Sequence, residues 1–252
     1  MTIKKATLAR NSTKKTAAPP SHKPAKKSQG KTNTGKAKIN AERVTAILKG
    51  LRKAYPDVVC ALHHTSAWEL TAATILSAQC TDVRVNLVTP ALFKRYPTPK
   101  ALANAPVEDI EQMIRTTGFY HNKAKSIQGA ARRLLGEFGG VVPNEMDKLL
   151  TLPGVARKTA NVVLGSWFRI AVGVVVDTHV MRLSQRLELT KATTPEKIEQ
   201  DLVKIIPRDR WIQFSHELIH HGRQVCIARK PRCADCTLEP LCDSRDKTWS
   251  TH

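Results

Sequence analysis

The segment "LPGVARKTANVVLGSWF" at residues 152–168 is the starting point for interpreting this chain. A Pro-Gly pair marks a turn, and the residues after it have the apolar spacing of a helix. With the short helical stretch before it, the segment predicts a helix-hairpin-helix. Gly154 gives the backbone freedom for a tight turn and lets a phosphate approach closely.

The amides at the start of the second helix are expected to be free donors. We expect those of Val155, Ala156 and Arg157 to lack partners within the helix and to bind a DNA phosphate. Such contacts recognise only the nucleic-acid backbone, so binding would not depend on base sequence. Pro-Gly also occurs at many helix corners without this role, so the turn needs support from other residues.

Lys158 provides that support, because it lies in the first turn of the second helix. The positive end of the helix dipole and the neighbouring Arg157 both disfavour a charged ammonium group there. A lysine that is easily deprotonated is suited to nucleophilic catalysis. The alternative is a lysine that only binds phosphate.

Asp177 follows nineteen residues later in "VVVDTHVMRL", where an apolar run ends and a helix is predicted to begin. Aspartate is a favoured N-cap residue, and a plain cap is the alternative interpretation. Near an amine, the same carboxylate stabilises a developing cation or takes a proton.

Four of the six cysteines fall within seventeen residues near the end of the chain. Cys226, Cys233, Cys236 and Cys242 have the spacing C-x6-C-x2-C-x5-C, which suits either zinc or a [4Fe-4S] cluster. The loop "IARKPR" between the first two contains three cations and predicts a phosphate-binding surface; the cations are Arg229, Lys230 and Arg232. The other two cysteines, Cys60 and Cys80, are expected to be ordinary thiols.

The net charge of +20 indicates a polyanionic partner, most often nucleic acid. Residues 1–40 contain eleven Lys and Arg and no acidic residue, and we expect residues 1–41 to form a disordered basic arm. No apolar run is long enough to span a membrane, and there is no secretory signal. We therefore expect a cytoplasmic, nucleoid-associated protein, with import into an organelle as the less favoured alternative.

From residue 41 onward the hydrophobic spacing is helical, which predicts an all-α protein with about ten short helices. A break or kink is expected at Pro90, and a left-handed helix stop at Gly118. Only "RIAVGVVV" at residues 169–176 looks like a strand, and one apolar run cannot make a sheet. The helical segments are residues 42–55, 65–79, 82–96, 98–105, 107–118, 122–138, 144–152, 157–168, 177–187, 194–206 and 208–222.

Two stretches, "LPGVARKTANVV" and "VVDTHVMRLSQR", together resemble the helix-hairpin-helix DNA glycosylases, and closely their endonuclease III branch. The resemblance implies that Lys158 attacks C1′ of a damaged deoxynucleotide and that Asp177 is the second essential residue. It implies a bifunctional enzyme that expels an oxidised pyrimidine from duplex DNA, or acts at an abasic site, and cuts the strand 3′ to the lesion by β-elimination. The cysteine spacing equals the [4Fe-4S] motif of this branch.

The resemblance covers about residues 42–245 and implies two helical domains that flank a DNA-binding cleft. One domain would span residues 62–168, and the cluster domain would combine residues 42–61 with 169–245. By the same match, Gln79 inserts toward the estranged base when the damaged nucleotide flips out, and Phe119 stands where the family often has a leucine wedge. A monomer is the default expectation.

Two rival functions remain open from the sequence. Adenine-specific mismatch glycosylases carry a catalytic glutamate in the helix that corresponds to residues 70–79, and no carboxylate occurs there in this chain. They also usually lack the hairpin lysine. A DNA-binding module without catalysis, in which Lys158 only contacts phosphate, is the second rival.

Overall fold

The computed structural model describes residues 40–248, and every regular element in this range is a helix. The prediction of an all-α fold is confirmed. The basic arm predicted at residues 1–41 lies outside the described residues, apart from its last two, and Ala41 already begins the first helix. No helix in the described range is both long enough and apolar enough to cross a membrane.

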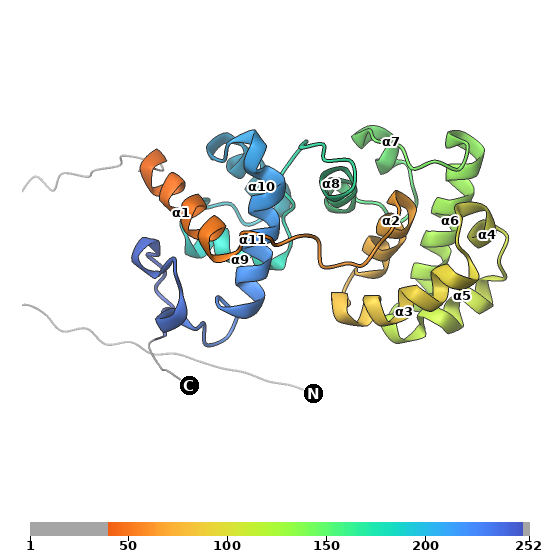
Figure 1. Cartoon of the computed structure of the whole chain (residues 1–252), viewed down its shortest axis with the longest axis horizontal. Coiled ribbons are helices and arrows are strands. Elements are labelled where there is room, and N and C mark those ends of the chain that lie inside the picture. The colour runs from red at the N-terminus through yellow and green to blue at the C-terminus, as the bar shows by residue number, and fades with distance from the viewer. Residues whose placement is uncertain (1–39, 249–252) are drawn as a thin grey trace, which may run out of the picture. The chain divides into compact units, whose positions relative to one another are not determined.

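Eleven α-helices and four short 3-10 helices follow one another along the described residues (Figure 1). The α-helices are α1 (Ala41–Ala54), α2 (Ala67–Leu76), α3 (Asp82–Arg95), α4 (Pro99–Ala103), α5 (Val107–Ile114), α6 (Tyr120–Phe138), α7 (Met146–Leu150), α8 (Arg157–Ser166), α9 (Thr178–Arg186), α10 (Pro195–Ile205) and α11 (Trp211–Gln224). The 3-10 helices are η1 (Arg115–Thr117), η2 (Arg208–Arg210), η3 (Cys233–Asp235) and η4 (Glu239–Leu241).

The buried apolar side chains form two separate clusters. One draws on residues 62–164, so that α2 to α8 share it. The other joins residues 44–51 to residues 174–238, and α1 therefore packs against α11 although most of the chain separates them (Figure 1). The division into two domains, residues 62–168 and residues 42–61 with 169–245, stays a prediction.

Helix ends follow from local side-chain chemistry. Ser66 caps α2, since its Oγ accepts a hydrogen bond from the Glu69 amide at 3.1 Å. The carboxylate of Glu69 turns back to the amide of Thr65 at 2.6 Å, one residue further out than a capping box requires. Gly139, with φ of 60°, ends α6 in the left-handed conformation.

Two local predictions need correction. The helix α3 runs through Pro90 without interruption. Gly118 has a positive φ of 71° but an extended ψ of 155°, and the left-handed residue is its neighbour Phe119. Residues 169–176 form no strand, as expected for a single apolar run without a partner; Val174 and Val176 lie in the second core, whereas Val172 packs against the first.

The predicted helix-hairpin-helix is α7, a turn over residues 151–156, and α8. Gly154 adopts φ of +78°, and a Cβ there would lie 2.8 Å from Cβ of Ser126 and 3.1 Å from Cγ2 of Ile75. The turn thus packs directly against α6 and α2. Glycine is required by packing as well as by conformation.

The end of α8 meets α11 through a partly buried polar contact. Oγ of Ser166 lies 3.3 Å from Nε2 of His216. Burial lowers the pKa of His216 to about 4, and the positive charge of Arg169 acts in the same direction. The imidazole is therefore neutral near pH 7.

Replacing Gly154 with alanine is expected to lower the free energy of unfolding by about 1–3 kcal/mol, because the new methyl group meets Ser126 and the positive φ is strained. Chemical denaturation measures the change. Gly136→Ala in α6 is the matched control, since a Cβ there meets nothing within 4 Å. Equal effects of the two substitutions would contradict the packing argument.

The His216 contact predicts a pH dependence of stability. Between pH 6.5 and about 4 the unfolded chain binds a proton that the folded histidine does not, so the free energy of unfolding falls as the pH falls through this window. In His216→Asn the loss of stability between pH 7 and pH 5 should be smaller by about 1–2 kcal/mol. His63→Asn, at an exposed histidine, is the control; an unchanged slope in His216→Asn would refute the assignment.

Candidate active site and cysteine cluster

Lys158 and Asp177 line the same two adjoining pockets, as the sequence-based pairing requires. One residue comes from the first core region and the other from the segment that follows it. Five residues are common to both pockets, namely Ser77, Asp82, Lys158, Asp177 and Arg223. The candidate catalytic pair therefore shares one hollow lined by several polar side chains.

The Lys158 side chain is exposed at the second position of α8. It forms no hydrogen bond or ion pair with any residue between 40 and 248, although Asp177 lines the same pockets. Its helix has Ala156 at the N-cap, where no side chain caps the free amides. The amine is thus available to a ligand that enters the pocket.

Asp177 is the N-cap of α9, and its two carboxylate oxygens differ in their environment. Oδ1 accepts hydrogen bonds from the amides of His179 and Val180, each at 2.8 Å. Oδ2 has no hydrogen-bond partner among the described residues. Capping and a chemical role are therefore compatible, because the cap occupies only one oxygen.

The turn amides differ from the sequence prediction in one respect. The amide of Val155 donates to the carbonyl of Leu152 at 3.0 Å, so the prediction that it is a free donor is wrong. This bond closes the turn itself. The amides of Ala156 and Arg157 have no acceptor within residues 40–248, and they point from an uncapped helix start.

Gln79 and Phe119 both have backbones in the left-handed region, with φ of 52° and 49°. This conformation is unfavourable for a bulky aromatic residue. Gln79 is exposed and lines a pocket together with Lys158 and Asp177. Phe119 is 65% exposed, which is unusual for an aromatic side chain. It lines neither of the two pockets.

Sequence reasoning missed an ion pair at these pockets. Nη2 of Arg223 in α11 lies 2.7 Å from Oδ2 of Asp82 in α3, and both residues line both pockets. The two residues are 141 positions apart, so no local motif could have indicated the contact.

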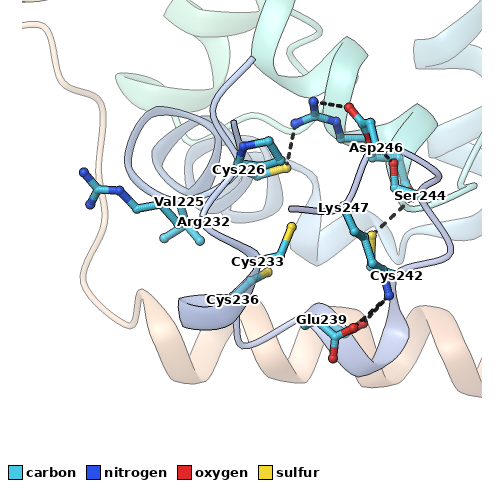
Figure 2. A pocket seen from close by; sticks show the side chains of 12 residues that line it. Val225, Cys226, Arg232, Cys233, Cys236, Glu239, Cys242, Ser244, Asp246 and Lys247 are labelled. Carbon is cyan, nitrogen blue, oxygen red and sulfur yellow. Dashed lines mark hydrogen bonds and ion pairs between the residues drawn. The ribbon is translucent and has the colours of Figure 1, made fainter. Parts of the chain in front are cut away.

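The four C-terminal cysteines line one pocket (Figure 2). Arg186, which the sequence analysis did not single out, organises it: its Nη1 donates to Sγ of Cys226 at 3.2 Å and to the carbonyl of Ile227 at 2.8 Å. Its Nη2 pairs with Asp246. The amide of Thr248 donates to Sγ of Cys233 at 3.4 Å.

Burial, with the nearby cysteines acting in the same direction, raises the pKa of Cys236 to about 11. Burial also raises the pKa of Cys242. Thiols so close together keep their protons unless a positively charged group is bound among them. The chemistry of this donor set thus suits a metal-containing group that is ligated by thiolates.

The three predicted basic residues of the loop are exposed, namely Arg229, Lys230 and Arg232. Figure 2 shows the Arg232 side chain pointing away from the cysteines. The loop therefore presents its cations outward, while its carbonyls at Ile227 and Ala228 are held by Arg186.

Comparison with known proteins places the chain in a family. Residues 72–208 match the HhH-GPD superfamily of base excision DNA repair proteins. Endonuclease III of Synechocystis is 59% identical over 203 residues, which are 81% of this chain and 93% of that protein. Endonuclease III of Escherichia coli K12 is 40% identical over 83% of this chain and 99% of its own length.

Among solved structures, a trapped covalent endonuclease III–DNA intermediate with an estranged adenine is similar, with a TM-score of 0.78 and 41% identity. It covers 82% of this chain and 97% of its own. The resemblance found in the hairpin and aspartate motifs is confirmed. The chain belongs to the endonuclease III family within the HhH-GPD superfamily.

Proposed function

We propose that Lys158 and Asp177 are the catalytic residues of this protein, a bifunctional DNA glycosylase and AP lyase of the endonuclease III family that removes oxidised pyrimidines in base excision repair. The observation that carries the proposal is the unpartnered amine of Lys158 in pockets that it shares with the free oxygen of Asp177. A covalent intermediate, as trapped in a similar protein, needs such a nucleophile.

The reaction begins when the neutral amine of Lys158 forms a bond to C1′ of the damaged nucleotide. The bond from C1′ to the base breaks, and the base leaves with the electron pair and takes up a proton. The attached amine then loses a proton, and the bond from C1′ to the ring oxygen breaks as this oxygen takes up a proton, which gives a protonated imine between Lys158 and C1′. The free oxygen of Asp177 stabilises the positive charge that develops in these steps.

The imine makes the C2′ hydrogen acidic. Loss of this proton, followed by departure of the 3′ phosphate from C3′, cuts the strand on the 3′ side by β-elimination. Water then hydrolyses the imine and regenerates the lysine. Asp177 remains an N-cap throughout, because Oδ1 keeps its two backbone hydrogen bonds.

The partner is double-stranded DNA that contains a damaged base or an abasic site. The free amides of Ala156 and Arg157, at a glycine turn, bind a phosphate without reading sequence. The outward cations Arg229, Lys230 and Arg232 add further phosphate contacts. Gln79 and Phe119, exposed and held at positive φ, fill the space that a flipped nucleotide leaves.

Cys226, Cys233, Cys236 and Cys242 hold a [4Fe-4S] cluster. The spacing C-x6-C-x2-C-x5-C equals the [4Fe-4S] motif of the endonuclease III branch, and the four thiols line one pocket. The role of the cluster is to tie the C-terminal loop together.

The two rival functions have no observation in their favour. The similar proteins named above are endonuclease III enzymes, and α2 has no carboxylate after Glu69. Cytoplasmic location and a monomeric state stay predictions from the sequence.

Borohydride trapping on a duplex with one thymine glycol tests the catalytic assignment. The wild-type protein should form a covalent adduct and nick the strand, and Lys158→Ala should form no adduct, because the amine is the nucleophile. Asp177→Asn should keep its cap through the amide oxygen but lose about 10²-fold or more in rate. Lys49→Ala, an exposed lysine in α1, is the control. An adduct in Lys158→Ala would refute the proposal.

The cluster is tested by metal analysis of the purified protein. We expect about four iron and four sulfide per chain with a broad visible absorbance, and loss of this absorbance in Cys233→Ser. Cys60→Ser, at a thiol outside the pocket of the four cysteines, should keep it. One zinc per chain without iron would contradict the assignment.

A further inference from the structure

Glu199 is a buried carboxylate that binds the helix carrying Lys158. It lies in α10 and is 8% exposed. Its Oε2 accepts from Nε of Arg157 at 2.8 Å, and its Oε1 accepts from Nη2 of Arg157 at 3.1 Å and from Nδ2 of Asn161 at 3.0 Å. Arg157 is the residue before Lys158, and Asn161 lies one turn later on the same helix. One carboxylate therefore holds the first two turns of α8.

The same carboxylate touches the segment that leads to Asp177. A Cβ placed on Gly173 would lie 1.9 Å from Oε1 of Glu199 and 3.0 Å from Nδ2 of Asn161. Only glycine leaves room for the carboxylate at this point. Gly173 is buried, four residues before Asp177. Glu199 is thus in contact with both chain segments that bring the candidate catalytic residues together.

Apart from the contacts to Glu199, few contacts among the described residues fix the start of α8 relative to α10. Its N-cap, Ala156, has no side-chain hydrogen bond, and Lys158 itself has no partner. The turn at Gly154 fixes the helix against α6 and α2, on the side of the first core. The contacts to Glu199 are the ion pair and hydrogen bonds that join the helix start to α10 and the second core.

We propose that Glu199 is a positioning residue for the reaction: by binding Arg157 and Asn161 beside Gly173, it sets the place of the Lys158 amine relative to Asp177. The inference rests on the proposed roles of Lys158 and Asp177. Small displacements of reacting groups lower the reaction rate by large factors. Loss of the contacts to Glu199 should therefore slow the covalent step more than it weakens DNA binding.

Glu199→Gln is the test variant, because its amide group keeps the shape but turns an N–H donor toward the donors of Arg157 or Asn161. The measurement is single-turnover borohydride trapping with an abasic duplex over a range of protein concentrations, which separates the saturating rate from the dissociation constant. We expect a saturating rate about tenfold or more below wild type, with a dissociation constant changed by less than about threefold.

Glu196→Gln is the matched control. Glu196 lies one turn earlier on α10, is exposed and has no hydrogen bond or ion pair with the described residues. It should behave as wild type. If Glu199→Gln does not fold, Arg157→Gln tests the same contact from its exposed end, since the Arg157 side chain is 50% exposed and the backbone amide is retained.

An unchanged saturating rate in the folded variant, with only a lower melting temperature or weaker DNA binding, would overturn the inference. So would an equal loss of rate in Glu196→Gln. If instead Lys158 is not the nucleophile, Lys158→Ala will still form the adduct, whatever the result with Glu199→Gln.

Discussion

The site depends on the placement of one helix start. The first turn of α8 is held on one side by close packing of Gly154 against Ser126 and Ile75, and on the other by the ion pair between Arg157 and Glu199. The free amides of Ala156 and Arg157 and the amine of Lys158 lie between these two contacts. A helix start without a side-chain cap leaves its first amides without acceptors, and here those of Ala156 and Arg157 stay free.

Two carboxylates near this helix have opposite surroundings. Glu199 is buried, and both of its oxygens accept hydrogen bonds from the chain. Asp177 uses one oxygen for the cap of α9 and keeps the other free in a pocket shared with Lys158. A fully paired carboxylate fixes geometry, whereas a half-paired one retains capacity for chemistry. The two residues show how local hydrogen bonding separates a fully paired carboxylate from one that keeps a free oxygen.

A residue outside the C-terminal loop holds the loop in place. Arg186, at the end of α9, binds Sγ of Cys226, two loop carbonyls and Asp246. Burial, with the nearby cysteines acting in the same direction, raises the pKa of Cys236 to about 11 and makes its thiolate costly without a bound cationic group. Contacts from α9 thus order the loop around the four cysteines, while the Arg232 side chain faces outward.

The sequence determined the helical class, the hairpin, the cysteine spacing and the candidate pair, because each is encoded within a short window: a turn signal, a helix period or a fixed spacing. Pro90 and Gly118 misled, because α3 continues through the proline and the left-handed backbone falls at Phe119, one residue after the glycine. Only the tertiary structure showed that the amide of Val155 donates a hydrogen bond within the turn. It alone showed the ion pair of Asp82 with Arg223 and the contacts of Glu199 with α8. The two ion pairs join residues 141 and 42 positions apart, and no local pattern records which distant side chains folding will bring together.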